Sequence, residues 1–217
     1  LVIYESTVFP GTTEDYCVPI LEEFSNLEYN TDFSVAYSPE RINPGDEEHT
    51  LRNTVKLISA SNRQAIKIVH DMYSLVVKEA NLYTCESIKV AESAKITENI
   101  QRDVNIALMN ELTTIFHELN INTKSVIEAA STKWNFMKFT PGLVGGHCIG
   151  VDPYYMIHKA EMLGIDSKLI KTARKVNREI VEYVWEKIKE DLSNNNQDSK
   201  NLKVLHLGIT FKENCDD

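Results

Sequence analysis

The sequence is poor in basic residues and has no long apolar run. Its 23 Lys and Arg are outnumbered by 32 Asp and Glu, giving a formal net charge of -9. Nucleic-acid binding depends on clustered Lys and Arg, so this balance argues against a nucleic-acid partner. No stretch approaches the roughly 18 apolar residues that span a bilayer, and the N-terminus does not resemble a signal peptide. We therefore expect a cytoplasmic globular protein with no membrane partner.

Cysteine pairs at metal-binding spacing are also missing. The four cysteines are Cys17, Cys85, Cys148 and Cys215, and none forms a CxxC pair. This pattern fits neither a zinc site nor a small fold held by disulfides, so we expect free thiols and no metal. Most such cysteines are buried apolar residues, and a reactive one has to be identified from its surroundings.

Glycine is scarce, and half of it lies in one segment. Residues 141–152 hold four of the eight glycines, which predicts a tight loop that a ligand can approach closely. A helix is expected to start after Asp152 with Pro153 at its first position. Cys148 would then lie near a helix N-terminus, where a thiolate is favoured. The alternative is that Asp152 only caps the helix and Cys148 is a packing residue.

Hydrophobic periodicity divides the chain into an α/β part and a helical part. Short β-branched runs alternate with helical patterns up to residue 88, which predicts the later part of an open α/β sheet. Apolar residues then recur at helical spacing from Val90 to Leu119 and predict one long helix with an apolar face. The expected strands are 1–6, 33–37, 54–59 and 80–84, and the expected helices are 12–27, 62–76, 87–120, 123–131, 153–163 and 167–192.

Both ends of the chain are abrupt. Residues 1–4 have the pattern of a buried strand, with no methionine and no segment before it. After the polar stretch 193–199, residues 203–208 have the pattern of a new strand with few residues behind it. We therefore expect an internal piece of a longer protein, with a further domain beginning near residue 201.

Polar residues occupy three places where a ligand is expected. Lys95 and Asn99 are spaced i, i+4 and share one face of the long helix. Thr7 and Glu40 each follow a predicted strand, on the side where open α/β sheets bind ligands. Each has a simpler interpretation: a solvated helix face for Lys95 and Asn99, a surface ion pair of Glu40 with Arg41, and a cap at Thr7.

Together these motifs resemble the UDP-glucose/GDP-mannose dehydrogenase family over essentially the whole chain. The resemblance is carried, in the family's order and at about its spacings, by residues 5–8, 38–41, 95–99, 145–148 and 210–214. The amino-acid sequences of residues 41–46, 133–136 and 142–152 are most similar to the branch that oxidises UDP-N-acetylhexosamines.

The resemblance implies a domain organisation as well as a function. Residues 1–88 would be the C-terminal part of a Rossmann-like NAD-binding domain. Residues 89–192 would be a central helical domain that carries the cysteine loop and pairs subunits into a homodimer. Residues 201–217 would begin a Rossmann-like UDP-binding domain. The family's GxGxxG turn, which binds NAD, is absent from these residues. We therefore do not expect this fragment to catalyse the reaction by itself.

The implied reaction is a double oxidation of the C6 alcohol of a UDP-sugar to a uronic acid, with two NAD consumed. By similarity, Cys148 would attack the aldehyde and pass through a thiohemiacetal to a thioester. Lys95 and Asn99 would stabilise the oxyanions. Asp152 would take up and return protons, and Glu40 would activate water or accept the alcohol proton.

The resemblance also implies the binding residues. Thr7 would hold the hydrolytic water or the nicotinamide edge, and the cofactor would be contacted by Thr7, Glu40 and Cys148. The implied substrate-binding residues are Glu40, Lys95, Asn99, Phe139, Gly142, Gly145, Gly146 and Lys212.

The sequence also allows two other functions. One is a non-catalytic nucleotide-sugar-binding or dimerisation module that lacks the cofactor half. The other is a single-step dehydrogenase of the 6-phosphogluconate or hydroxyacyl type, whose helical domain also follows an α/β domain. A single-step enzyme has no need of Cys148.

Overall fold

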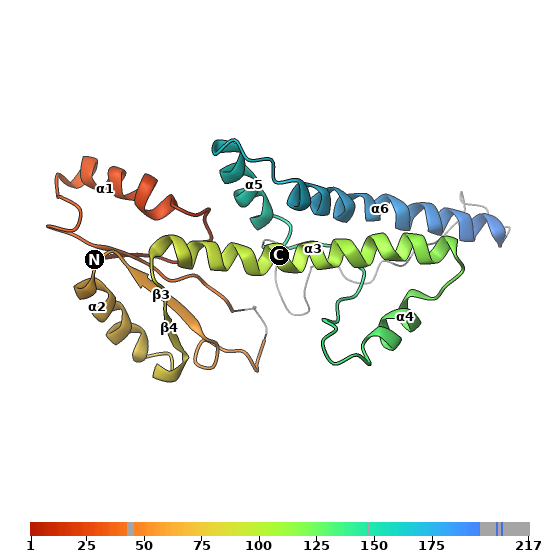
Figure 1. The fold of residues 1–217 in the computed structure, drawn as a ribbon, viewed down its shortest axis with the longest axis horizontal. Helices are drawn as coiled ribbons and strands as arrows, with labels where there is room; N and C mark the ends of the chain where they lie inside the picture. The colour runs from red at the N-terminus through yellow and green to blue at the C-terminus, as the bar shows by residue number, and fades with distance from the viewer. Residues whose placement is uncertain (43–45, 147, 196–202, 204, 206–217) are drawn as a thin grey trace.

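Two parts of different architecture share one long helix in the computed structural model of this chain (Figure 1). The structure describes residues 1–42, 46–146, 148–195, 203 and 205. Most of the strand predicted near 203–208, together with Lys212 and Cys215, lies outside the described residues. Within the described part of the chain, no helix is both long and apolar enough to cross a bilayer.

The α/β part is built on a four-stranded mixed sheet. Its strands, in sheet order, are β1 (Val2–Tyr4), β2 (Val35–Tyr37), β3 (Lys56–Ala60) and β4 (Leu82–Thr84). β1 and β2 are parallel, whereas β3 runs antiparallel to β2 and parallel to β4. The four predicted strands are therefore confirmed, although most are shorter than expected. The segments that follow β1 and β2 meet the start of β3 at one edge of the sheet, where Lys56 contacts Glu5 and Pro39.

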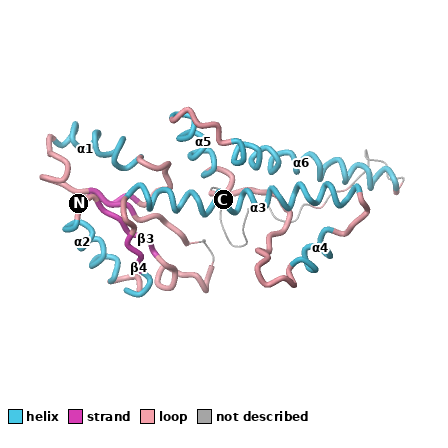
Figure 2. Tube along the Cα trace, viewed as in Figure 1, coloured by secondary structure: helices cyan, strands magenta, loops and turns pink. Residues whose placement is uncertain are grey.

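Helices cover both faces of this sheet (Figure 2). The α/β part contains η1 (Thr13–Cys17, a π-helix), α1 (Val18–Ser25), α2 (Arg63–Ser74) and η2 (Glu79–Asn81, a 3₁₀-helix). The helix predicted over 12–27 is thus η1 continued by α1, and it ends at Asn26 in the left-handed region with φ 57°. α2 begins where the side chain of Asn62 accepts a hydrogen bond from the N–H of Ala65, a typical N-cap.

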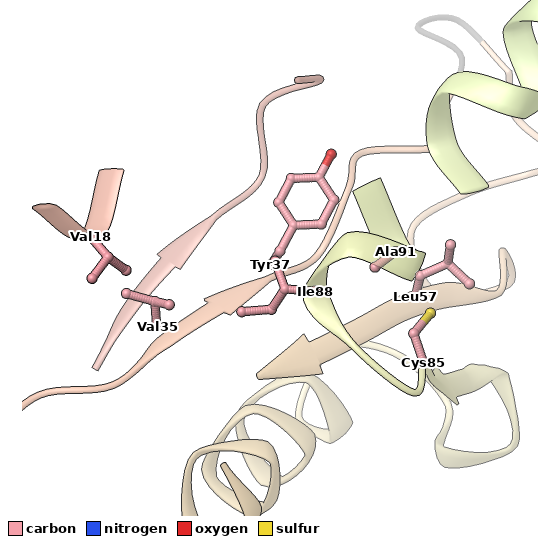
Figure 3. Packing of buried hydrophobic residues seen from close by; sticks show 7 residues of the cluster. All are labelled: Val18, Val35, Tyr37, Leu57, Cys85, Ile88 and Ala91. Carbon is pink, nitrogen blue, oxygen red and sulfur yellow. The ribbon is translucent and has the colours of Figure 1, made fainter. Parts of the chain in front are cut away.

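β2 is buried on both faces because its side chains alternate between two clusters. Val35 and Tyr37 pack with Ile88 on the face shared by α1 and the start of α3 (Ile88–Glu118), as Figure 3 shows. Ala36 points to the opposite face and packs with Val69 of α2. All three β2 residues are fully buried, and this rigid strand fixes the segment that follows it.

The helical part follows α3. Its other members are α4 (Thr123–Ala130), α5 (Asp152–Met162) and α6 (Lys168–Asn194), and α6 runs along α3 (Figures 1 and 2). α3 begins at Ser87, whose hydroxyl accepts a hydrogen bond from the N–H of Val90. The long helix and the three that follow it are confirmed to within about two residues at their ends, the usual uncertainty of helix boundaries.

The buried face of α3 differs from the predicted apolar face. Val90, Leu108 and Leu119 of the apolar stripe are between 44% and 60% exposed. The buried side combines apolar residues such as Ile96 and Ala107 with five polar or charged ones, Glu92, Lys95, Asn99, Asp103 and Asn110. These positions also recur at helical spacing, and their burial becomes possible because other elements supply hydrogen-bond partners.

Candidate active site

Lys95 and Asn99 lie one turn apart on the buried side of α3. Lys95 is 8% exposed and Asn99 is 7% exposed, so the interpretation of a solvated helix face is wrong. Burying an ammonium group and an amide is costly unless other groups compensate them. The compensating element is α5, which packs against α3.

Asp152 is the α5 residue that meets this polar pair. Asn99 donates from its Nδ2 to Oδ2 of Asp152 over 2.5 Å, and Asp152 is almost completely buried. Burial raises the pKa of Asp152, against the hydrogen bond from Asn99 and the positive charge of Lys95, which both favour the carboxylate. A carboxyl group placed in this way is suited to exchanging protons.

The start of α5 corrects one prediction. The helix begins at Asp152 with Val151 as its N-cap, and no side chain caps it. Asp152 therefore points to α3 instead of capping α5, and Pro153 is the second helical residue instead of the first. The alternative that Asp152 is only a cap is wrong.

Cys148 occupies the turn that leads into α5. Its backbone carbonyl accepts hydrogen bonds from the N–H groups of Val151 (3.0 Å) and Asp152 (2.8 Å). These bonds place Cys148 one turn ahead of Asp152, with its side chain exposed. Gly146, two residues earlier, has a φ of 81°, a conformation that favours glycine. An exposed thiol beside a helix N-terminus is a suitable nucleophile.

Thr7 and Glu40 lie at the edge of the sheet where β1 and β2 end. The N–H of Glu40 donates to the carbonyl of Glu5 over 3.4 Å, which continues the β1–β2 pairing beyond the strands. The Glu40 carboxylate is exposed and accepts from the N–H groups of Arg41 and Ile42, both at 2.7 Å. Thr7 is half-buried. Among the described residues, no hydrogen bond or ion pair joins Thr7 or Glu40 to Asn99 or Asp152.

The Arg41 guanidinium does not form the ion pair with the Glu40 carboxylate that the simpler interpretation expected. The guanidinium forms an ion pair with Glu98 of α3 at 2.7 Å and donates to the carbonyl of Val55 at 2.7 Å. The segment after β2 is thereby attached to α3 one residue before Asn99. This contact brings the edge of the sheet close to the polar face of α3.

The glycine-rich loop lies beside α3 and α6. Phe139 and Gly146 are half-buried, whereas Gly142 and Gly145 are exposed, and a Cβ on either of these two would meet no atom within 4 Å. Neither glycine is therefore required by crowding within the chain. Open space at these positions is consistent with a loop that faces a ligand.

Tyr37 is a site residue that the sequence analysis missed. It is completely buried at the end of β2, and its hydroxyl has no hydrogen-bond partner within the described part of the chain (Figure 3). Burial raises the pKa of Tyr37 far above its usual value, and the negative charges of Glu92 and Asp152 add to this effect. The position of Tyr37 directly before Ser38, Pro39 and Glu40 was the available signal.

A second missed cluster holds the segment that carries Glu40. Lys56 is buried at the start of β3, and its Nζ lies 3.1 Å from Oε1 of Glu5 and donates to the carbonyl of Pro39 over 3.4 Å. Tyr73 donates to the same Glu5 oxygen over 2.5 Å. Burial works against ionisation of Glu5, but the hydrogen bonds from Tyr73 and Lys56 and the Lys56 charge together lower its pKa.

Comparison with known sequences identifies the protein family to which this chain belongs. A model described as the NAD binding domain of the UDP-glucose/GDP-mannose dehydrogenase family matches residues 1–77, and one described as the family's central domain matches residues 89–179. The chain belongs to the UDP-glucose/GDP-mannose dehydrogenase family. Residues 78–88 separate the two matches, and the second begins at the start of α3, where the α/β part gives way to the helical part.

Relatives and solved structures agree with this membership. "Protein CapL" of Staphylococcus aureus and a UDP-N-acetyl-D-glucosamine 6-dehydrogenase of Salmonella typhi are each 51% identical over 217 residues. Each match covers 100% of this chain and 51% of the relative, so the chain spans about half the length of these curated relatives. The solved structure of a UDP-D-ManNAc dehydrogenase from Pyrococcus horikoshii superposes with a TM-score of 0.82 at 35% identity, over 91% of this chain and 46% of that one. The predicted fold class, an α/β part followed by an all-α part, is confirmed.

Proposed function

We propose that the complete protein is an NAD-dependent nucleotide-sugar 6-dehydrogenase. It would oxidise the C6 alcohol of a UDP-sugar to the uronic acid in two steps. The observation that carries this proposal is the contact between Asn99 and Asp152, with buried Lys95 one turn away and the exposed Cys148 one turn ahead of Asp152. In this proposal, Cys148 would be the nucleophile, Asp152 the proton acceptor, and Lys95 and Asn99 the donors to an oxyanion, where α3 meets α5.

The chemistry assigns each of these groups a role. In the first oxidation, C6 loses a hydride and its hydroxyl proton and becomes an aldehyde. The Cys148 sulfur then bonds to the aldehyde carbon, and loss of a second hydride and the hydroxyl proton leaves a thioester. Water adds to that carbon, the carbon–sulfur bond breaks, and the thiol is restored beside a carboxylate. Asp152 accepts and returns protons, while Lys95 and Asn99 stabilise the oxyanions.

The sheet edge suits one end of the cofactor. NAD, when bound, accepts the hydride in each oxidation. Parallel strands bind such ligands outside their carboxyl ends, and Thr7 and Glu40 follow the ends of the parallel pair β1 and β2. The Tyr37 hydroxyl, buried at the end of β2, has no hydrogen-bond partner among the described residues. These residues fit the nicotinamide end, with Thr7 and Glu40 on the cofactor side and Cys148 on the sugar side.

The substrate class is taken from the relatives. Two relatives named as UDP-N-acetyl-D-glucosamine 6-dehydrogenases, from Salmonella typhi and Pseudomonas aeruginosa, are 51% and 50% identical to this chain. Relatives named as UDP-N-acetyl-D-mannosamine dehydrogenases are 34% to 36% identical. We therefore assign a UDP-N-acetylhexosamine as the substrate. The loop from Phe139 to Gly146, with Glu40, Lys95, Asn99 and Lys212, would bind it.

Assembly and location complete the proposal. Residues 1–88, 89–192 and 201–217 would belong to the cofactor-binding, central helical and UDP-binding domains. Exposed apolar side chains such as Leu108, Ile115 and Leu119 lie along α3, and their burial against a second copy would form a homodimer through the helical part. A cytoplasmic location suits the thiols of Cys17, Cys85 and Cys148, all of which are free.

The test is the stoichiometry of the reaction in the complete protein. Purified enzyme would be supplied with UDP-N-acetylglucosamine, UDP-N-acetylgalactosamine, UDP-glucose or GDP-mannose, and NADH and uronic acid would be counted. We expect two NADH for each acid formed, and the highest kcat/KM with a UDP-N-acetylhexosamine. One NADH per product would favour a single-step dehydrogenase. No turnover with any of the four would favour a binding or dimerisation module.

A further inference from the structure

One buried asparagine holds the backbone of the glycine-rich loop. Asn110 of α3 is completely buried, and its Nδ2 donates to the carbonyl of Gly142 over 3.0 Å. The N–H of Gly142 donates back to Oδ1 of Asn110 over 2.8 Å. A side-chain amide thus satisfies both backbone groups of a loop residue, much as a neighbouring strand would. Only asparagine and glutamine carry a donor and an acceptor in such a fork.

The amide of Asn110 is fixed in this orientation by a second asparagine. Nδ2 of Asn110 also donates to Oδ1 of Asn177 over 2.9 Å. The Asn177 amide in turn donates to the backbone carbonyl of Asp103 (3.0 Å) and to its Oδ1 (2.8 Å). Rotation of either amide would place like groups against each other. The network therefore presents one donor and one acceptor to Gly142 in a set geometry.

The other end of the network approaches the same loop beyond Cys148. Arg174 of α6 donates to Oδ1 of Asp103 over 2.5 Å, and both side chains are buried. A Cβ on Gly150 would come within 4.0 Å of Nη2 of Arg174. The Arg174 guanidinium also lies 5.6 Å from the ring centre of Tyr154, in the first turn of α5. The network thus contacts the loop at Gly142, six residues before Cys148. It also approaches the chain at Gly150, two residues after Cys148.

Stability alone gives a poor account of this arrangement. A buried ion pair with its amides is often no more stable than apolar residues of the same volume, because desolvation offsets the attraction. Here Oδ2 of Asp103 and Nε of Arg174 are buried without a hydrogen-bond partner among the described residues, so part of that cost is not recovered. What the network does achieve is a fixed position for the loop backbone.

We propose that Asn110 is a positioning residue, which sets the place of the glycine-rich loop and so of Cys148 and the nucleotide sugar. Asn177, Asp103 and Arg174 hold Asn110 in its working orientation. The inference rests on the proposed function, in which the loop binds the substrate. Asn110 contacts the loop through the backbone of Gly142, so its effect on the reaction passes through Gly142.

The test compares Asn110→Ala with Asn105→Ala in the complete protein. Asn105 is a matched control, because it lies on the same helix and its amide donates, within the part of the chain that the structure describes, only to the backbone carbonyl of Gln101, over 2.7 Å. Hydrogen exchange of the Gly142 amide reports the contact directly. Steady-state kinetics then report KM for the nucleotide sugar separately from KM for NAD.

We expect faster exchange at Gly142 in Asn110→Ala, and unchanged exchange in Asn105→Ala. We also expect kcat/KM for the nucleotide sugar to fall by about 100-fold, as when a site is misplaced by about 1 Å, with KM for NAD nearly unchanged. If Asn110→Ala does not fold, the isosteric Asn110→Asp keeps the volume but loses the donor to the Gly142 carbonyl, and the same effects are expected.

Three results bear on the inference in different ways. Unchanged exchange at Gly142 overturns the contact itself. Faster exchange with unaltered kinetics, or with both KM values raised equally, overturns the positioning role. If the wild-type protein forms no uronic acid, the proposed function fails, and Gly142 exchange together with the rate of Cys148 alkylation by iodoacetamide still decides whether Asn110 positions the loop.

Discussion

Asn99 on α3 donates a 2.5 Å hydrogen bond to Asp152 in the first turn of α5, and both side chains are buried. The two residues are 53 positions apart in the chain. Their contact joins the long helix to the helix that follows the cysteine loop. The proposed chemistry and the predictions below depend on that junction.

Cys148→Ser should abolish acid formation while leaving binding intact. A thiol ionises near pH 8.5 in the absence of perturbation, whereas an unassisted serine hydroxyl stays protonated at neutral pH. We expect the rate of uronic acid formation to fall by about 10³-fold or more, a typical loss for a nucleophile. Single-turnover mass spectrometry of the protein would show whether an ester or an aldehyde accumulates.

Cys17→Ser is the control for this substitution, because Cys17 is a free, half-buried thiol in η1. It should retain wild-type turnover. Acid formation at a near wild-type rate in Cys148→Ser would show that Cys148 is a packing residue.

Lys95→Met should lower kcat with little change in KM for NAD. The substitution keeps a long unbranched side chain in the buried site but removes the charge that would stabilise an oxyanion. Loss of one such donor typically lowers kcat by about 10²- to 10³-fold. Steady-state kinetics would measure this. Lys89→Met, two turns earlier on α3 and paired at its surface with Asp15, should leave kcat unchanged.

Asp152→Asn should change how stability depends on pH. The pKa of Asp152 is raised above its usual 3.8, so the folded state holds its proton more tightly than the unfolded state. The wild type must therefore lose stability as pH rises from below 3.8 through the folded pKa, because the buried carboxylate becomes charged. The variant has no such carboxylate and does not lose this stability. The difference between its thermal midpoint and that of the wild type should therefore increase in favour of the variant as pH rises across this window.

Asp71→Asn supplies the comparison for that measurement, since Asp71 is an exposed carboxylate on α2. Its midpoint should show no comparable rise relative to the wild type across the same window. A constant difference between Asp152→Asn and the wild type from pH 3 to pH 8 would contradict the raised pKa.

Leu108→Glu should weaken the proposed homodimer. Leu108 is 49% exposed on α3, and a charge buried in an interface without a partner costs several kcal/mol. Light scattering at micromolar concentration should show a shift toward monomer in the complete protein. Leu75→Glu, at an 84% exposed position after α2, should leave the mass unchanged. A folded wild-type protein that is already monomeric would exclude the dimer.

The sequence by itself determined the order and type of the elements. Strands such as β2 and helices such as α3 have local signals, which are β-branched runs and the 3.6-residue period. It also determined the family, because the motifs around Glu40, Asn99 and Cys148 stand in a fixed order. Signals of this kind need no knowledge of what packs against what.

Only the tertiary structure decided which faces of these elements are buried. Leu108 and Ile115 of the predicted apolar stripe are exposed in the chain, whereas Asn99 and Asn110 are buried. Helical spacing states that residues share a face, but the burial of that face depends on partners 32 to 74 positions away, such as Gly142 and Asn177. A hydrogen bond between distant residues has no local signature, because its free energy is gained only when packing has brought the two groups together and excluded water.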